Sequence, residues 1–279
     1  MKILNPIIVL YSCLVLVFLA HTHCKVGQGF VNALMPDLSE DVKLGAQANQ
    51  EIANNSKKFP LLPESGNEQV YSYVRGITTK ILNSGSIKHR NDFPWVVKII
   101  KDDKTLNAFC TPGGYIYVYT GLIKYLDSED QLAGVMGHEI AHADNRHSMQ
   151  QMVQLYGIQA LAGIGAQVAT KNSGNSTQKA AMTAAQVASA LVGLKFSRAH
   201  ETDADNSSVR YLCNTDYNAA GSAGFFEKIS KEATPPEWLS THQNPANRVQ
   251  NIYKESQQAG CAGSSKNVQQ YQKIKQLLK

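Results

Sequence analysis

The segment His138-Glu139-Ile140-Ala141-His142 constrains the fold and chemistry of this chain more than any other feature. If the segment is helical, one turn separates the two histidines, so both imidazoles project from the same face and can bind one metal ion. Glu139 lies between them and can take a proton from a water molecule beside the metal. The spacing therefore predicts a helix that carries a metal site and a base.

The residues before this segment predict where its helix begins. Ser128 is followed three residues later by Gln131, which is the spacing of a capping box. Two acids, Glu129 and Asp130, place negative charge in the first turn, where the helix dipole favours it. Apolar residues recur at three- and four-residue spacing from Leu132 onward. We expect a helix that begins near Glu129 and whose core-facing stripe also carries the metal ligands.

A catalytic zinc site needs a third protein ligand and keeps its fourth position open for water. The downstream candidates are His147, His200, Glu201, Asp203, Asp205 and His242. Glu201 and Asp205 open an apolar-periodic stretch and would share one helix face. Glu201 could bind the metal, and Asp205 could accept a hydrogen bond from a liganding histidine. From spacing alone, a solvated helix start is an equally good interpretation of both acids.

Two histidines near these positions are not expected to bind the metal. His147 lies five residues beyond His142, off the ligand face, so we expect it at the surface or next to a ligand. His200 is adjacent to Glu201 in sequence and would point away from it on a helix.

Motifs along most of the chain resemble the zinc metallopeptidase family that contains HtpX, the CAAX prenyl proteases and the BepA-like periplasmic proteases. The matching segments are Leu38-Ser39-Glu40-Asp41, Asn107-Ala108-Phe109, Pro112-Gly113-Gly114-Tyr115-Ile116, Gly137 to His142, Phe196-Ser197-Arg198 and Glu201 to Asp205. The site that this resemblance implies is one Zn²⁺ held by His138, His142 and Glu201, with Glu139 as general base and Asp205 as a polar partner or proton donor near the metal. Such a protein hydrolyses peptide bonds.

His242 enters through the same resemblance. Ser240-Thr241-His242, followed by Arg248 six residues later, is similar to a family segment whose histidine lies near the zinc, although the proline of that segment comes late here, as Pro245. Through the resemblance, His242 could stabilise the charge that develops on the tetrahedral intermediate or could mask the metal. The alternative is a loop histidine with no contact to the site.

The remaining periodicities predict an α+β fold in which helices are the majority. We expect helices over 37–54 and 68–82, a strand over 95–101, and a hairpin over 107–120, so that a small sheet precedes the metal-binding helix. The resemblance makes this a zincin-like metallopeptidase fold. An extended peptide could add as a strand to Ala108-Phe109-Cys110 or to the run from Tyr115 to Tyr119.

The first residues resemble a secretory leader. Lys2 is followed by a mostly apolar run from Ile3 to Ala20, so we expect residues 1–24 to be a signal peptide or an N-terminal anchor and 25–279 to form one catalytic domain. Export would place the protein in the periplasm or outside the cell. Membrane association through an uncleaved leader, or lipidation at Cys24, stays open. Nothing in the sequence predicts an oligomeric state.

In an oxidising compartment, Cys213 and Cys261 are the expected disulfide pair, and Cys110 is expected to be a small buried hydrophobic residue. Residues 157–194 are rich in small side chains and predict two helices, which could form a movable lid or a close-packed hairpin.

Polypeptides are the partners that these features favour. A net charge of +5 without any basic block argues against a nucleic-acid role. The leading hypothesis is an exported zinc endopeptidase in quality control of misfolded or unassembled envelope proteins. The alternative is a chaperone-like assembly factor whose peptidase site is latent or masked.

Overall fold

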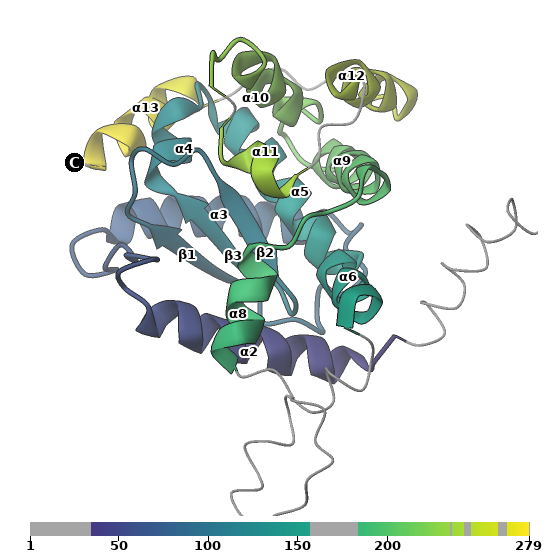
Figure 1. The fold of residues 1–279 in the computed structure, drawn as a ribbon. Coiled ribbons are helices and arrows are strands. Elements are labelled where there is room, and N and C mark those ends of the chain that lie inside the picture. Colours follow the sequence, from purple (N-terminus) through teal and green to yellow (C-terminus); the bar gives the residue numbers. More distant parts are fainter. Residues whose placement is uncertain (1–34, 157–183, 235, 243–246, 262–266, 279) are drawn as a thin grey trace, which may run out of the picture.

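A small sheet lies at the centre of the chain, and helices pack on both of its faces (Figure 1). This computed structural model describes residues 35–156, 184–234, 236–242, 247–261 and 267–278. The predicted leader over 1–24, including Cys24, lies outside the described residues, as does most of the predicted pair of helices over 157–194.

The sheet has the strand order β1-β3-β2. Its strands are β1 (Val96–Ile100), β2 (Ala108–Thr111) and β3 (Tyr115–Tyr119). β1 runs parallel to β3, whereas β2 and β3 form an antiparallel hairpin, as predicted. The prediction that β3 could accept a peptide strand is wrong, because β3 is paired on both sides. β2 pairs with β3 alone among the described strands, so it is an edge strand.

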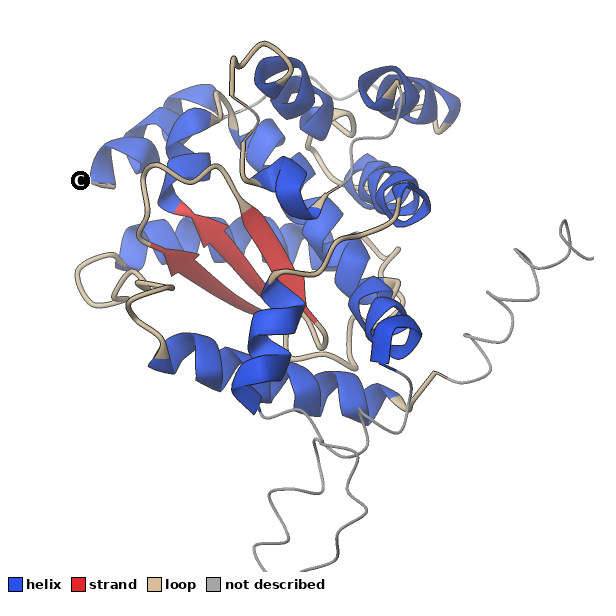
Figure 2. Cartoon of the chain, viewed as in Figure 1, coloured by secondary structure: helices blue, strands red, loops and turns tan. Residues whose placement is uncertain are grey.

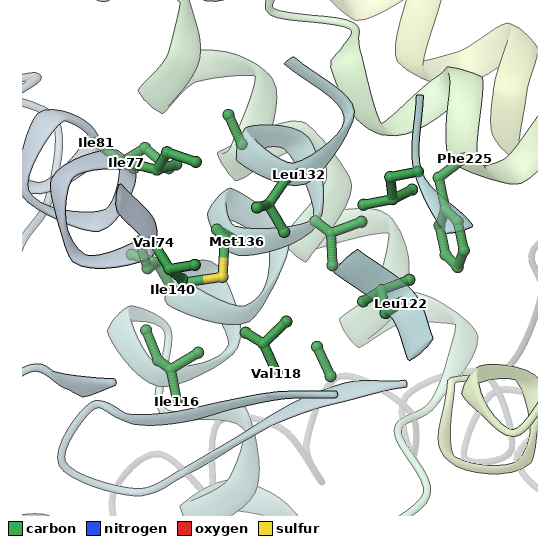
Figure 3. Packing of buried hydrophobic residues seen from close by; sticks show 14 of the residues in the cluster. Val74, Ile77, Ile81, Ile116, Val118, Leu122, Leu132, Met136, Ile140 and Phe225 are labelled. Carbon is green, nitrogen blue, oxygen red and sulfur yellow. The ribbon is translucent and has the colours of Figure 1, made fainter. Parts of the chain in front are cut away.

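One face of the sheet packs against α3 (Glu68–Leu82) and α5 (Glu129–Asp144) in the main hydrophobic core. Figure 3 shows this core, with labelled side chains from α3 (Val74, Ile77, Ile81), α5 (Leu132, Met136, Ile140), β3 (Ile116, Val118), α4 (Leu122) and α10 (Phe225). Successive strand residues point to opposite faces. Residues on the other face therefore form a second, aromatic cluster, which includes Phe109 and Tyr117.

That aromatic face is covered by α2 (Leu38–Asn54) and α8 (Ala184–Val192), which contribute Ile52 and Val192. The α2 and α3 bounds match the predicted helices. The other helices are α4 (Thr120–Tyr125), α6 (His147–Tyr156), α9 (Arg198–Cys213), α10 (Gly221–Ile229), α11 (Trp238–Thr241), α12 (Arg248–Gln258) and α13 (Val268–Leu277).

Helices clearly outnumber strands in the described chain, which confirms the mainly helical part of the predicted fold class (Figure 2). None of the helices within the described ranges combines the length and apolar character that a membrane span requires. A disulfide joins Cys213 at the end of α9 to Cys261 beyond α12, with 5.2 Å between the Cα atoms. This confirms the predicted pair, and Cys110 is a buried free cysteine, as expected.

Candidate metal centre

α5 begins where its capping residues predict. The side chain of Ser128 accepts a hydrogen bond from the Gln131 backbone N–H at 3.3 Å, and Gln131 in turn accepts one from the Asp127 N–H at 2.8 Å. From Leu132 to Asp144 every residue of the helix is buried. The expected single core-facing stripe is therefore too narrow a description, because neighbouring elements cover α5 on all sides.

Close approach of α9 to α5 brings the second half of the site to the first. A Cβ atom added at Gly137 would lie 2.6 Å from the Ser208 hydroxyl, so a larger residue would force that hydroxyl to move. The same hydroxyl donates a hydrogen bond to the carbonyl of Gly134 at 3.0 Å. α9 starts at the N-cap Ser197. One helical turn later, Glu201 therefore faces the two histidines of α5.

Four buried side chains point donor atoms at one small volume. His138, His142, Glu201 and His242 each offer one ligand atom, and these atoms lie within 4.8 Å of one another. The Nε2 atoms of His138 and His142 are 2.9 Å apart, and each lies 3.4 Å from a carboxylate oxygen of Glu201. His242 reaches this volume from the end of α11. The structure thus brings together all the predicted ligands and His242.

The donor set fits a divalent cation. Among the described residues, neither carboxylate oxygen of Glu201 nor Nε2 of His242 has a hydrogen-bond partner, although all are buried. Buried polar atoms that lack hydrogen bonds are costly, so the convergence of these atoms indicates a binding site for a further group. Imidazole nitrogens and one carboxylate in close proximity are typical ligands of zinc.

Glu139 is fully buried beside these donors, and its carboxylate lies 3.4 Å from Nε2 of His242. Both of its oxygens also lack a hydrogen-bond partner among the described residues. The carboxylate is therefore available to a water molecule. Burial and the negative charge of Glu139 raise the pKa of the neighbouring Cys110 thiol well above its ordinary value, so that thiol stays protonated.

A buried ion pair lies behind His138. The Nδ1 atom of His138 is 2.9 Å from Asp205, whose two oxygens accept hydrogen bonds from Nε and Nη2 of Arg248 at 2.7 Å each. Arg248 also lies 3.1 Å from Glu201 and packs over the ring of Phe226. Asp205 is thus placed to orient a histidine, as the spacing suggested.

The electrostatics of the cluster depend on these carboxylates. Burial lowers the pKa of His138, but the neighbouring carboxylates of Asp205 and Glu201 outweigh burial and raise that pKa to about 9. Burial raises the pKa of Glu201, yet the nearby histidines, first among them His242, hold it well below its usual range. Burial, together with the charge of His138, pushes the pKa of His142 well below its ordinary value. His142 therefore stays neutral, which is the form that binds a metal.

His142 is held from behind by two rings. Phe196 stacks on it with 3.9 Å between ring centroids, and Nδ1 of His147 lies 3.0 Å from Nδ1 of His142. His147 is only 3% exposed, so the surface alternative for this residue is wrong, and His147 lies next to His142, one of the predicted ligands. His200 stacks on His147 at 4.5 Å and lies outside the group of four donors, as expected.

Residues 68–256 match the sequence profile of peptidase family M48, which is more than half of the chain. The chain belongs to peptidase family M48. The M48 metallopeptidases use zinc, in agreement with the donor set of His138, His142, Glu201 and His242.

Curated M48 relatives come from bacteria and from mitochondria. The beta-barrel assembly-enhancing protease of Escherichia coli K12 is 29% identical over 188 residues, which cover 62% of this chain and 38% of the relative. Its Yersinia pestis counterpart is 23% identical over 80% of this chain and 47% of its own. The mitochondrial metalloendopeptidase OMA1 of Danio rerio is 31% identical over 57% of this chain and 35% of its own. The chain thus spans less than half the length of these relatives.

Two parts of this M48 site were not predicted from the sequence. Trp238 stacks on the ring of His242 with 4.1 Å between centroids, and no motif marked it. Asp203 contacts His147 at 3.1 Å, although it was considered only as a possible ligand. The available signal was that Asp203 lies two residues after Glu201 and so emerges on a different face of the helix.

Proposed function

We propose that this protein is a zinc-dependent endopeptidase that hydrolyses misfolded or unassembled proteins of the cell envelope. The observation that carries this proposal is the convergence of His138, His142 and Glu201 on one buried point, with the carboxylate of Glu139 beside it and without a hydrogen bond to any described residue. A structural metal site has no use for such a carboxylate.

Each side chain has a defined part in hydrolysis. A zinc ion at this point supplies a Lewis acid, and His138, His142 and Glu201 would hold it. Glu139 takes a proton from the attacking water and then passes it to the leaving amine of the peptide. Asp205, clamped by Arg248, keeps His138 oriented.

The substrate strand is proposed to add to β2. β2 is an edge strand, and it packs on α5 with Cys110 beside Glu139. An extended peptide paired with this edge would place its carbonyl groups near the base. A small sheet beside α5, the helix that carries His138 to His142, supports a zincin-like version of the mainly helical fold.

Two observations support a location in the cell envelope. The E. coli and Y. pestis relatives are named for beta-barrel assembly. The apolar run from Ile3 to Ala20 follows one lysine and has no arginine, which favours a secretory leader over a mitochondrial transit peptide. We therefore propose residues 1–24 as signal peptide or anchor, residues 25–279 as the catalytic domain, and the periplasm or the cell exterior as location, with Cys24 as the candidate for lipidation.

A second candidate is an assembly factor whose peptidase site is latent. All four potential ligands are at most 1% exposed, so a substrate cannot reach them without movement. The Phe196 N–H donates to the carbonyl of Thr241 at 3.0 Å, and Phe196 pairs with His242 as an isolated β-bridge. These contacts hold α11 over the metal centre.

Hydrolysis of casein by the wild type and by Glu139→Gln, with zinc content measured in both, tests the proposal. We expect one zinc per chain in each protein and activity in the wild type alone, because the variant keeps its ligands but loses the base. Glu40→Gln, on α2 at a residue whose side chain is 42% exposed and pairs with Lys43, is the matched control and should keep full activity. Equal activity in wild type and Glu139→Gln would overturn the endopeptidase assignment. Zinc without activity in the wild type would favour the latent form.

A further inference from the structure

A chain of side-chain contacts leads from the outer nitrogen of His142 to the protein surface. Nδ1 of His142 lies 3.0 Å from Nδ1 of His147, and Nε2 of His147 lies 3.1 Å from Oδ2 of Asp203. The side chain of His147 is 3% exposed and that of Asp203 is 51% exposed. A buried imidazole thus separates the metal centre from a carboxylate that contacts solvent.

A metal bound at Nε2 of His142 fixes the direction of both hydrogen bonds, from His142 to His147 and from His147 to Asp203. Nε2 of His142 faces the other donors and must be free of a proton to bind a cation, so its proton lies on Nδ1. Nδ1 of His142 therefore donates, and Nδ1 of His147 accepts. A neutral His147 then carries its own proton on Nε2, which donates to the carboxylate of Asp203. Only this pair of tautomers satisfies both contacts and the metal.

Packing holds His142, His147 and Asp203 in place. His147 is the first residue of α6 and stacks on His200, with 17° between the ring planes. Asp203 also accepts a hydrogen bond from the side chain of Asn145 at 2.8 Å. Phe196 covers the face of the His142 ring. The arrangement therefore selects one orientation of His142.

We propose that His147 and Asp203 are positioning residues that hold His142 in the tautomer and orientation that bind zinc. This inference rests on the proposed zinc site. The two histidine ligands are then supported differently: His138 contacts a buried carboxylate directly, whereas His142 reaches a half-exposed one through a second imidazole. Loss of His147 should weaken zinc binding more than loss of the charge on Asp203.

The test compares His147→Asn with His147→Leu. Asparagine can place an amide oxygen near the position of Nδ1 and accept the hydrogen bond from His142, whereas leucine has similar bulk but no acceptor. Zinc affinity is measured by competition with a fluorescent chelator, and ligand geometry by the absorption spectrum of the cobalt-substituted protein. Melting of the zinc-free proteins checks that they fold. Asp203→Asn, an exposed and nearly isosteric change, provides a variant that does not disturb the core.

We expect His147→Leu to weaken zinc binding about 10- to 100-fold and to shift the cobalt spectrum. His147→Asn should bind more tightly than His147→Leu, and Asp203→Asn should show a smaller loss. Asp216→Asn, which removes an exposed carboxylate paired with Lys80, should match the wild type. The proposal is overturned if His147→Leu and Asp203→Asn both bind zinc like the wild type, or if the leucine and asparagine variants are equally impaired. A wild type that binds no zinc would instead refute the metal site itself.

Discussion

His242 differs from the other three donors in the way it is held. His138, His142 and Glu201 lie on the long helices α5 and α9, whereas His242 ends the single-turn helix α11. It is stacked on Trp238, and its Nδ1 lies 3.0 Å from the hydroxyl of Thr241. Its ligand nitrogen therefore lies close to those of His138 and His142 and to the carboxylate of Glu201. We infer that it would occupy the coordination position that a catalytic zinc keeps for water.

Substitution of His242 by alanine should raise peptidase activity. Three ligands remain in His242→Ala, so zinc is retained, while the position that His242 blocks becomes open to water and substrate. The rate of casein hydrolysis and the zinc content measure both effects. His89→Ala, at a histidine paired with Asp92 away from the metal centre, is the control and should not change the rate. A fall in activity with zinc retained would show that His242 stabilises the transition state instead of masking the metal.

Residues of the site differ in how far the sequence could predict them. His138, Glu139 and His142 share one helix, so their spacing alone determines their common face. Glu201 lies on another helix, and spacing left it equivalent to a solvated acid until the family resemblance selected it. The contact between His147 and Asp203 depends on how α6 packs against α9. Hydrophobic periodicity carries no information about such a contact between two polar side chains.

At the scale of elements, two glycines determine how closely α5 packs against α10. A Cβ atom added at Gly134 would overlap the backbone of Gly221 and Ser222 in α10. A Cβ atom added at Gly221 would likewise overlap the backbone carbonyl of Asp130 in α5. The two helices therefore approach more closely than any larger residue would permit.

Gly134→Ala should destabilise the protein in spite of the higher helix propensity of alanine. Overpacking against a backbone costs about 1 to 3 kcal/mol, and the gain in propensity offsets up to about 1 kcal/mol of that. Gly76→Ala, in the interior of α3 with nothing near the added methyl group, is the matched control and should stabilise the protein by up to about 1 kcal/mol. Urea denaturation measures both changes. Equal stabilisation by the two substitutions would contradict the close crossing.

In the sheet, too, the sequence predicted the local elements but not the order in which the strands pair. The pattern of strand 95–101 and hairpin 107–120 predicted which residues form β1, β2 and β3, because alternation and turn residues are local signals. It did not predict the strand order, in which β1 pairs with β3 and leaves β2 at the edge. Tyr115 to Tyr119 therefore lies in the middle of the sheet, where its dense β-branched and aromatic side chains contact both clusters.

At the scale of the whole molecule, the disulfide ties the ligand helix α9 to the segment after α12. Cys213 and Cys261 are 48 residues apart in sequence, and a cross-link of that span lowers the entropy of the unfolded chain by an amount worth about 4 kcal/mol. The paired change Cys213→Ser and Cys261→Ser should lower the melting temperature. Cys110→Ala, which keeps the disulfide, should respond to a reducing agent as the wild type does, whereas the paired serine variant should not respond. A melting temperature unaffected by reduction of the wild type would contradict a stabilising disulfide.

Zinc should act as a second cross-link, because its three proposed ligands come from two helices, α5 and α9. A ligand that binds only the folded state stabilises it by about 4 kcal/mol at a free concentration 1,000 times its Kd. Removal of the metal with a chelator should therefore lower the melting temperature of the wild type, and added zinc should restore it. Glu139→Gln, which keeps every ligand, should show the same shift, whereas Glu201→Gln should melt at the lower temperature with or without zinc. If elemental analysis shows that chelation empties the site and the melting temperature of the wild type is unchanged, α5 and α9 are held together by their packing alone.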